Sequence, residues 1–181
     1  MIALNPGVFR AYDIRGLVGR DLDPDFAEEL GRACGTLFTR RGLTRAVAGH
    51  DCRATSPEYL DRLCLGLSSA GVDVITLGLV STPVLYYAVK HFGLEAGVMV
   101  TASHNPPEYN GFKVWCGATT LHGEGVTALY DLMVVRDFVR AERPGLVSRH
   151  DVVPAYLDEL SSQLALSRPI KVVVDGGKLM P

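Results

Sequence analysis

The sequence lacks the features that mark nucleic-acid-binding, membrane and secreted proteins. Its 18 Lys and Arg residues are balanced by 20 Asp and Glu residues, and a net charge of −2 gives no basic surface for nucleic acid. No apolar run approaches the roughly 20 residues that a membrane-spanning helix needs. The opening Met-Ile-Ala-Leu-Asn-Pro has neither a basic region nor a long apolar core, which argues against a signal peptide. We therefore expect a cytoplasmic protein that binds neither nucleic acid nor a membrane.

Cysteine and histidine patterns typical of metal sites are also missing. The four cysteines, Cys34, Cys52, Cys64 and Cys116, show no C-x-x-C spacing, and the five histidines form no H-E-x-x-H motif. We expect reduced and mostly buried thiols rather than a zinc site or a disulfide framework.

The sequence does contain the composition and rhythm of an α/β protein. Hydrophobic residues make up 48% and charged residues 21% of the 181 positions, enough for one domain and a little more. Short apolar segments alternate with segments of helical spacing, which begin at Asp23-Pro24, Ser56-Pro57 and Thr82-Pro83. At the first two of these starts, the Asp and the Ser are expected to cap the helix. This order predicts an α/β fold with right-handed crossovers.

A polar stretch between two apolar segments is the most informative part of the chain. Residues 101–113 read Thr-Ala-Ser-His-Asn-Pro-Pro-Glu-Tyr-Asn-Gly-Phe-Lys, and buried strands are expected at Gly97–Thr101 and Phe112–Cys116. The two consecutive prolines restrict the backbone of the loop. We therefore expect a stiff loop that presents Ser103 at the end of a strand.

The residues around Ser103 suit phosphoryl chemistry. His104 and Lys113 can bring positive charge to the serine, and a transferred phosphoryl group carries negative charge on its equatorial oxygens. The alternative is an Asn- and Pro-rich turn with a solvated serine. Because a polar loop of about ten residues is longer than the usual connection, the pattern favours a functional loop.

A second segment, Phe9–Gly16, alternates apolar and charged residues. Arg10, Asp13 and Arg15 interleave with apolar side chains, a pattern that also fits an edge hairpin with a surface ion pair. Arginine suits phosphate because its planar guanidinium group offers paired donors and stays protonated. The residues alone leave both interpretations open.

Three motifs of the chain resemble those of one enzyme family. Residues 101–113 resemble the phosphoserine loop of the α-D-phosphohexomutases, above all the bacterial phosphomannomutase/phosphoglucomutase group. Phe9-Arg-Ala-Tyr-Asp-Ile-Arg-Gly16 resembles the N-terminal motif of that family, and Thr82-Pro-Val-Leu-Tyr-Tyr-Ala88 resembles a third segment. The resemblance covers essentially the whole chain, and two long motifs make it specific. It implies a mixed, mostly parallel sheet covered by helices.

The resemblance implies a phosphoryl shuttle centred on Ser103. In the family, a phosphoserine donates its phosphoryl group to a hexose monophosphate, and the resulting hexose 1,6-bisphosphate turns over within the cleft. The serine then takes back the other phosphoryl group, so that hexose 1-phosphate and hexose 6-phosphate interconvert. The sugar is mannose and/or glucose. Mg²⁺ sits on the phosphoserine oxygen, which makes Ser103 the expected metal ligand as well.

The resemblance also assigns roles to side chains around that serine. His104, Lys113 and Arg15 are expected to stabilise its charge, and one of them to help move the hydroxyl proton. Tyr12 and Arg15 are expected to face the substrate and the phosphoserine, with Arg10 as a weaker candidate for substrate binding.

The segment Gly49–Arg53 departs from the family at one position. The family usually reads Gly-Arg-Asp-x-Arg there, whereas this chain has His50 in place of the first arginine. Asp51 and Arg53 are expected to form a structural ion pair beneath the Ser103 loop rather than to act in catalysis.

The pattern divides the chain into two parts. Residues 1–145 are expected to form the N-terminal domain, with a linker at Ala141–Gly145, and residues 146–181 the start of a second α/β domain. That start is expected to hold a helix from Val153 and a buried strand at Ile170–Asp175. Because so short a unit cannot form a core alone, the remaining domains of the same polypeptide are the expected partners.

The sequence contains no counterpart of two functional parts of the family. In the family, an Asp-Gly-Asp-x-Asp-Arg loop supplies the other Mg²⁺ ligands, and a further loop sets the choice of sugar. A hard cation needs several oxygen ligands, so the 181-residue chain alone is expected to be inactive.

Two other functions compete with the mutase hypothesis. One is a non-catalytic module that binds phosphorylated sugars. The other is a serine hydrolase that uses Ser103 and His104, which is disfavoured because no G-x-S-x-G motif is present and adjacent side chains diverge.

Overall fold

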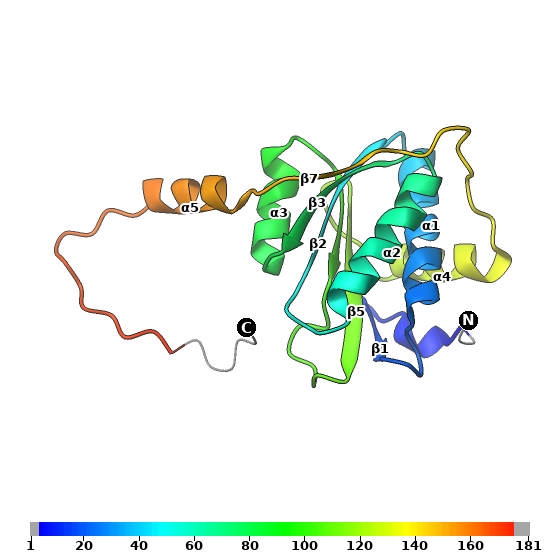
Figure 1. Cartoon of the computed structure of the whole chain (residues 1–181), viewed down its shortest axis with the longest axis horizontal. Helices are drawn as coiled ribbons and strands as arrows, with labels where there is room; N and C mark the ends of the chain where they lie inside the picture. Colours follow the sequence, from blue (N-terminus) through cyan, green and yellow to red (C-terminus); the bar gives the residue numbers. More distant parts are fainter. Residues whose placement is uncertain (1–3, 176–181) are drawn as a thin grey trace.

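The structure, a computed structural model, describes residues 4–175. Its elements in chain order are η1 (Pro6–Val8), β1 (Ile14–Leu17), α1 (Pro24–Arg40), β2 (Arg45–His50), α2 (Ser56–Ser69), β3 (Asp73–Leu79), α3 (Thr82–His91), β4 (Ala96–Val100), β5 (Tyr109–Cys116), β6 (Thr119–Thr120), α4 (Glu124–Val135), β7 (Val147–Arg149) and α5 (Val153–Ser162) (Figure 1).

One mixed sheet forms the centre of the fold. Its strand order is β1-β5-β4-β2-β3-β7, with β6 paired to β5. The strands β4, β2, β3 and β7 run parallel to one another, whereas β5 runs antiparallel to both β4 and β1. The prediction of an α/β fold with a mixed, mostly parallel sheet is therefore confirmed.

Helices cover both faces of the sheet. The helices α1, α2 and α4 lie on one face and α3 on the other (Figure 1). Successive side chains of a strand point to opposite faces, so Ala46 and Ala48 join the core under α1 and α2, whereas Val47 packs under α3. This two-sided burial explains why the central strands are short apolar runs.

The helices α1 and α2 approach each other through glycine. A Cβ atom at Gly31 would lie 2.3 Å from the carbonyl oxygen of Leu63, and one at Gly66 would lie 2.1 Å from that of Glu28. Only glycine permits this close contact. The start of α1 is capped as predicted, because the Asp23 carboxylate accepts a 2.6 Å hydrogen bond from the backbone N–H of Phe26.

The C-terminal part begins in the first sheet. The strand β7 lies just beyond the predicted boundary at residue 145, and it pairs with β3, with Val147 opposite Val74. The helix α5 then packs against α3, where the rings of Tyr87 and Tyr156 lie 5.3 Å apart. The division into residues 1–145 and 146–181 stays a prediction.

The strand predicted at Ile170–Asp175 is wrong. These residues are exposed and form no strand, and they lie on an extended loop that leaves α5 and curves back without pairing with the sheet (Figure 1). A strand needs a hydrogen-bonded neighbour, and no described strand lies beside this segment. The adjoining Gly176-Gly177 and the last residues lie outside the part that the structure describes.

Among residues 4–175, no helix is long and apolar enough to cross a membrane.

Candidate functional site

The Ser103 loop follows directly from the buried strand β4. The hydroxyl group of Thr101, at the start of the loop, donates a 2.7 Å hydrogen bond to the Asp51 carboxylate. It accepts a 2.9 Å hydrogen bond from the backbone N–H of Ser103. Ser103 is exposed and has a φ angle of 56°, in the left-handed region that non-glycine residues seldom occupy. Such strained backbone clusters at functional sites and persists only where the surroundings hold it.

Arg53 supplies much of that support. Its guanidinium group donates hydrogen bonds to four main-chain carbonyls of the loop and the start of β5, those of Ser103 (3.0 Å), Asn105 (2.6 Å), Pro106 (2.7 Å) and Tyr109 (3.0 Å). The same group lies 3.2 Å from the Asp51 carboxylate, so the ion pair expected beneath the loop is present. Arg53 thus ties both ends of the loop to the end of β2.

Asp51 connects this clamp to α2. Its carboxylate accepts a 2.6 Å hydrogen bond from the hydroxyl of Ser56, and that hydroxyl accepts one of 3.0 Å from the side chain of the buried Asn110. The prediction that Ser56 caps α2 is wrong, because the N-cap position is Thr55 and Ser56 is the first residue of the helix, with its side chain in this network. Asn110 holds the start of β5 against the same network.

A second cluster lies where β1 meets β5. One oxygen of the Asp13 carboxylate accepts hydrogen bonds from Arg15 Nε (2.9 Å), Arg15 Nη2 (2.6 Å) and Lys113 Nζ (2.9 Å). The other edge of the Arg15 guanidinium group donates a 2.6 Å bond to Asn105 of the loop. The structure therefore brings two of the predicted site residues together and joins one of them to the Ser103 loop.

Asp13 is charged in this setting. Its side chain is 6% exposed, and burial by itself would raise the pKa of its carboxyl group. The hydrogen bonds from Arg15 and Lys113, together with their positive charges, outweigh burial and leave the pKa lowered. Asp13 was not among the predicted site residues, although it stands in the Phe9–Gly16 motif between two arginines.

The other predicted site residues are solvent-facing. Tyr12 is 73% exposed, and Arg10 and His104 are exposed as well. Within the described residues, no side-chain hydrogen bond joins any of the three to Ser103. Their expected roles toward substrate and phosphoryl group stay predictions, as do the catalytic roles of Ser103, Arg15 and Lys113.

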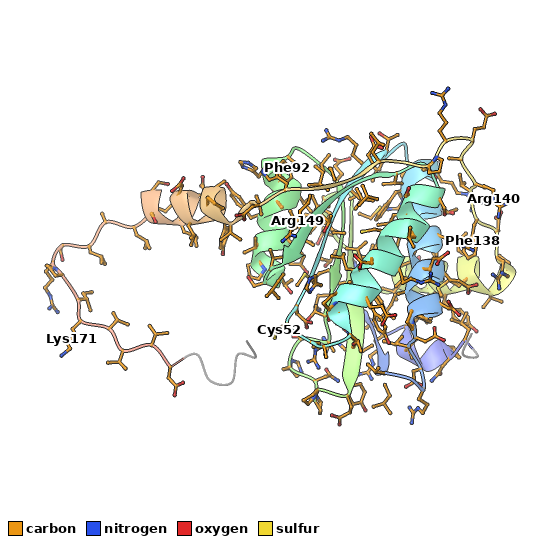
Figure 2. All side chains as sticks on the ribbon, in the orientation of Figure 1. Cys52, Phe92, Phe138, Arg140, Arg149 and Lys171 are labelled. Carbon is orange, nitrogen blue, oxygen red and sulfur yellow. The ribbon has the colours of Figure 1, made fainter. Side chains whose placement is uncertain are left out.

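A shallow pocket of about 300 Å³ opens beside the loop. Its lining combines the end of β2 with the loop, namely Asp51, Cys52, Arg53, Ala54, Ser103, Asn105 and Pro107. Figure 2 labels Cys52 between β2 and α2 at this end of the sheet. Ser103 is therefore accessible from this pocket.

The described residues do not make up a Mg²⁺ site by themselves. Within residues 4–175, no group of three or more His, Cys, Asp or Glu side chains could hold a metal ion. The candidate ligand Ser103 supplies a single oxygen, whereas Mg²⁺ prefers octahedral coordination by oxygen.

Comparisons with known proteins point to one family. A family model described as phosphoglucomutase/phosphomannomutase, alpha/beta/alpha domain I, matches residues 6–133. The chain is 39% identical over 177 residues to a phosphoglucomutase of Neisseria gonorrhoeae and 41% identical over 174 residues to a phosphomannomutase/phosphoglucomutase of Pseudomonas aeruginosa. These matches cover 98% and 96% of this chain but only 38% and 37% of the two relatives.

A solved structure gives the same result. The crystal structure of a phosphoglucomutase/phosphomannomutase family protein from Burkholderia thailandensis superimposes with a TM-score of 0.87 at 35% identity. The match covers 92% of this chain and 38% of that one.

Proposed function

The chain belongs to the phosphoglucomutase/phosphomannomutase family, and we propose that it carries the phosphoryl-accepting site of a phosphohexomutase. In this proposal Ser103 is the phosphoryl carrier, and the substrate is a hexose 1-phosphate or 6-phosphate, of mannose and/or glucose. The relatives named as phosphoglucomutases and phosphomannomutases support the activity, and the chain spans about 38% of their length.

One observation carries the proposal. Ser103 stands exposed and in the left-handed backbone region on a loop that Arg53 holds by four carbonyl hydrogen bonds. A hydroxyl group that is fixed in this way can meet an incoming phosphorus atom in line without a further loss of freedom. A solvated turn serine would need neither the strain nor the clamp.

The neighbouring cations fit the charge of the reaction. Phosphoryl transfer spreads negative charge over the equatorial oxygens, and fixed N–H donors stabilise it. We assign this role to Arg15 and Lys113, with His104 beside Ser103 in the chain. The Arg15 guanidinium group and the Lys113 ammonium group have no acceptor atom, so the proton of the attacking hydroxyl group passes to the imidazole ring of His104.

The reaction then needs two transfers at Ser103. The phosphoserine O–P bond breaks as a sugar hydroxyl attacks phosphorus, which leaves a free Ser103 hydroxyl and a hexose 1,6-bisphosphate. After the bisphosphate turns around, Ser103 attacks its other phosphoryl group and releases the isomeric monophosphate. Mg²⁺, when bound, would stabilise the developing charge; its further ligands are proposed to come from the remaining domains of the polypeptide.

Mass spectrometry of Ser103 tests the proposal. The complete polypeptide of the source gene is incubated with glucose 1,6-bisphosphate and Mg²⁺, and its peptides are mapped. We expect a phosphoryl group on Ser103 and interconversion of glucose 1- and 6-phosphate. The Ser103→Ala variant should lose both with its fold intact, whereas Ser162→Ala, on the exposed face of α5, should keep both. Full turnover by Ser103→Ala would remove this residue from the mechanism.

The alternative is a non-catalytic module that binds phosphorylated sugars. The 181-residue chain alone is proposed to be inactive, because the metal ligands and the sugar-specificity loop are not among its residues. Turnover by the isolated chain well above background would contradict this. Sequencing the source gene past the codon for Gly177 separates the two functions: a continuing frame with an Asp-x-Asp-x-Asp-Arg loop supports the mutase, and a stop supports the binding module.

A further inference from the structure

Asp13 holds the two cations of the site on one oxygen atom. The strands β1 and β5 are antiparallel, with Ile14 opposite Phe112, so the residue before Ile14 and the residue after Phe112 are cross-strand neighbours. This places Asp13 next to Lys113, from which it is 100 positions away in the chain. Arg15 reaches back to the same oxygen from its own strand.

The Asp13 carboxylate also offsets the electrostatic repulsion between the two cations. An Arg15 guanidinium group and a Lys113 ammonium group that share one acceptor would repel each other if it were neutral. Asp13 is buried and its carboxyl pKa is lowered, so the acceptor is negatively charged at neutral pH. The cluster as a whole keeps one net positive charge beside the loop.

The hydrogen bonds of the cluster leave donors available for a ligand. Arg15 has five N–H groups, of which the described contacts use three, and Lys113 has three, of which they use one. Four N–H groups therefore remain. The Arg15 guanidinium group is held by Asp13 on one edge and by Asn105 of the Ser103 loop on the other, and the Lys113 ammonium group is held by Asp13.

We propose that Asp13 is a positioning residue, whose carboxylate orients Arg15 and Lys113 so that their remaining N–H groups converge on a phosphate group beside Ser103. This inference rests on the proposed function for the identity of the phosphate group. Asp13 itself touches no reacting atom. It acts through the two cations, as a partner that fixes the direction of its neighbours' donors.

The sign of one effect separates positioning from simple charge balance. If Asp13 served only as a counter-charge, its removal would raise the local charge and tighten the binding of inorganic phosphate. If it positions Arg15 and Lys113, its removal lets the two cations separate, and binding weakens by about tenfold.

Titration with inorganic phosphate, followed by ¹⁵N NMR of the Arg15 Nε–H and Lys113 Nζ groups, tests the proposal on the chain itself. The unchanged chain should show a sharp Arg15 Nε–H signal that shifts with phosphate. In Asp13→Ala this signal should broaden, and the dissociation constant for phosphate should rise about tenfold. Asp13→Asn keeps the shape of the side chain, so it should broaden the Arg15 signal and raise the dissociation constant in the same way but by less. This variant replaces Asp13→Ala in the test if the alanine variant does not fold.

Asp21→Asn is the matched control. Asp21 is 7% exposed and also accepts hydrogen bonds from an arginine, Arg20, but it lies beyond the far end of β1 and does not touch Arg15. This variant should leave the Arg15 signal and phosphate binding unchanged. Equal or tighter phosphate binding by folded Asp13→Ala, or no binding at Arg15 and Lys113 in the unchanged chain, overturns the inference. An unphosphorylated Ser103 in a chain with Asp13-dependent phosphate binding would overturn only the proposed function.

Discussion

Arg53 donates a 3.0 Å hydrogen bond to the main-chain carbonyl of Ser103, the residue proposed to carry the phosphoryl group. The same guanidinium group bonds to three further carbonyls up to Tyr109, so one side chain fixes a whole turn of backbone. Carbonyl oxygens of a loop need partners when water is partly excluded, and a planar group with five donors can serve several at once. The position of Ser103 thus depends on a residue 50 positions earlier.

Replacing Arg53 should loosen the loop. We expect Arg53→Ala to lower the free energy of unfolding by about 2 kcal/mol, because it removes several charge-assisted hydrogen bonds from a half-buried site. The backbone amides of residues 101–109 should exchange with solvent faster, and Ser103 phosphorylation should fall. Hydrogen exchange with mass spectrometry measures the exchange rates of these amides.

A surface arginine provides the control for that experiment. Arg40 pairs with Asp137 at 2.8 Å, and both side chains are largely exposed. Arg40→Ala should change stability by less than about 1 kcal/mol and leave the loop amides unchanged. Equal exchange of these amides in Arg53→Ala and the unchanged chain would contradict the clamp.

The backbone of Ser103 predicts an unusual rank order of substitutions. Its φ angle of 56° costs little for glycine and about 1 kcal/mol or more for other residues. Ser103→Gly should therefore be more stable than Ser103→Ala by about 1 kcal/mol, or roughly 2–4 °C in melting temperature. At Ser162, the last residue of the helix α5, alanine should be the more stable replacement, by less than the roughly 1 kcal/mol of a helix interior. Calorimetry gives the melting temperatures of the four variants. A higher melting temperature for alanine than for glycine at both positions would contradict the backbone strain at Ser103.

Local features of the site could be predicted from the sequence, because they depend on neighbours in the chain. The prolines of the Ser103 loop predict a restricted backbone, and the Asp51–Arg53 ion pair joins residues only two positions apart. Contacts across the sheet could not be predicted in this way. Alternating side chains show which residues share a face, but not that β1 would lie beside β5 and bring Asp13 to Lys113.

Predictions failed where tertiary contacts decide the outcome. Ser56 is the expected cap of α2, but it is the first residue of the helix, and Thr55 holds the N-cap position. The Ser56 hydroxyl donates a hydrogen bond to the Asp51 carboxylate and accepts one from the Asn110 side chain instead. The apolar run at Ile170–Asp175 has the composition of a strand but no neighbouring strand among the described residues. Composition alone therefore identifies a segment that can form a strand, not one that does.

Asp21 should make stability depend on acid pH. The hydrogen bond from Arg20 and then that from the Leu17 backbone N–H lower the pKa of its carboxyl group from 3.8 to about 2. A lowered pKa in the folded state stabilises the fold above the unfolded value, and this contribution disappears as the pH falls through the folded value. Asp21→Asn should be less stable by about 1 kcal/mol at pH 7, a figure reduced for screening around the exposed Arg20.

Urea unfolding of both chains at several pH values measures that difference. It should stay constant above pH 4 and shrink between about pH 4 and pH 2. A difference that grows on acidification would mean that the pKa of Asp21 is raised in the folded chain, against the hydrogen bonds that the structure shows.

The four cysteines should differ sharply in reactivity. Cys52 is exposed, whereas the other three are buried, and burial raises the pKa of Cys34 and Cys116 and that of Cys64 to about 12. Since the thiolate is the nucleophile, Ellman's reagent at pH 8 should modify one thiol in the folded chain and four in denaturant. Cys52→Ser should leave none that reacts rapidly.

Because Cys52 lines the pocket beside Ser103, its bulky adduct should also slow Ser103 phosphorylation, whereas the small adduct from a methylthio reagent should slow it less. Rapid reaction of two or more thiols in the folded chain would mean that the core around α1, α2 or β5 opens readily, because a buried thiol reacts only as fast as its surroundings unfold.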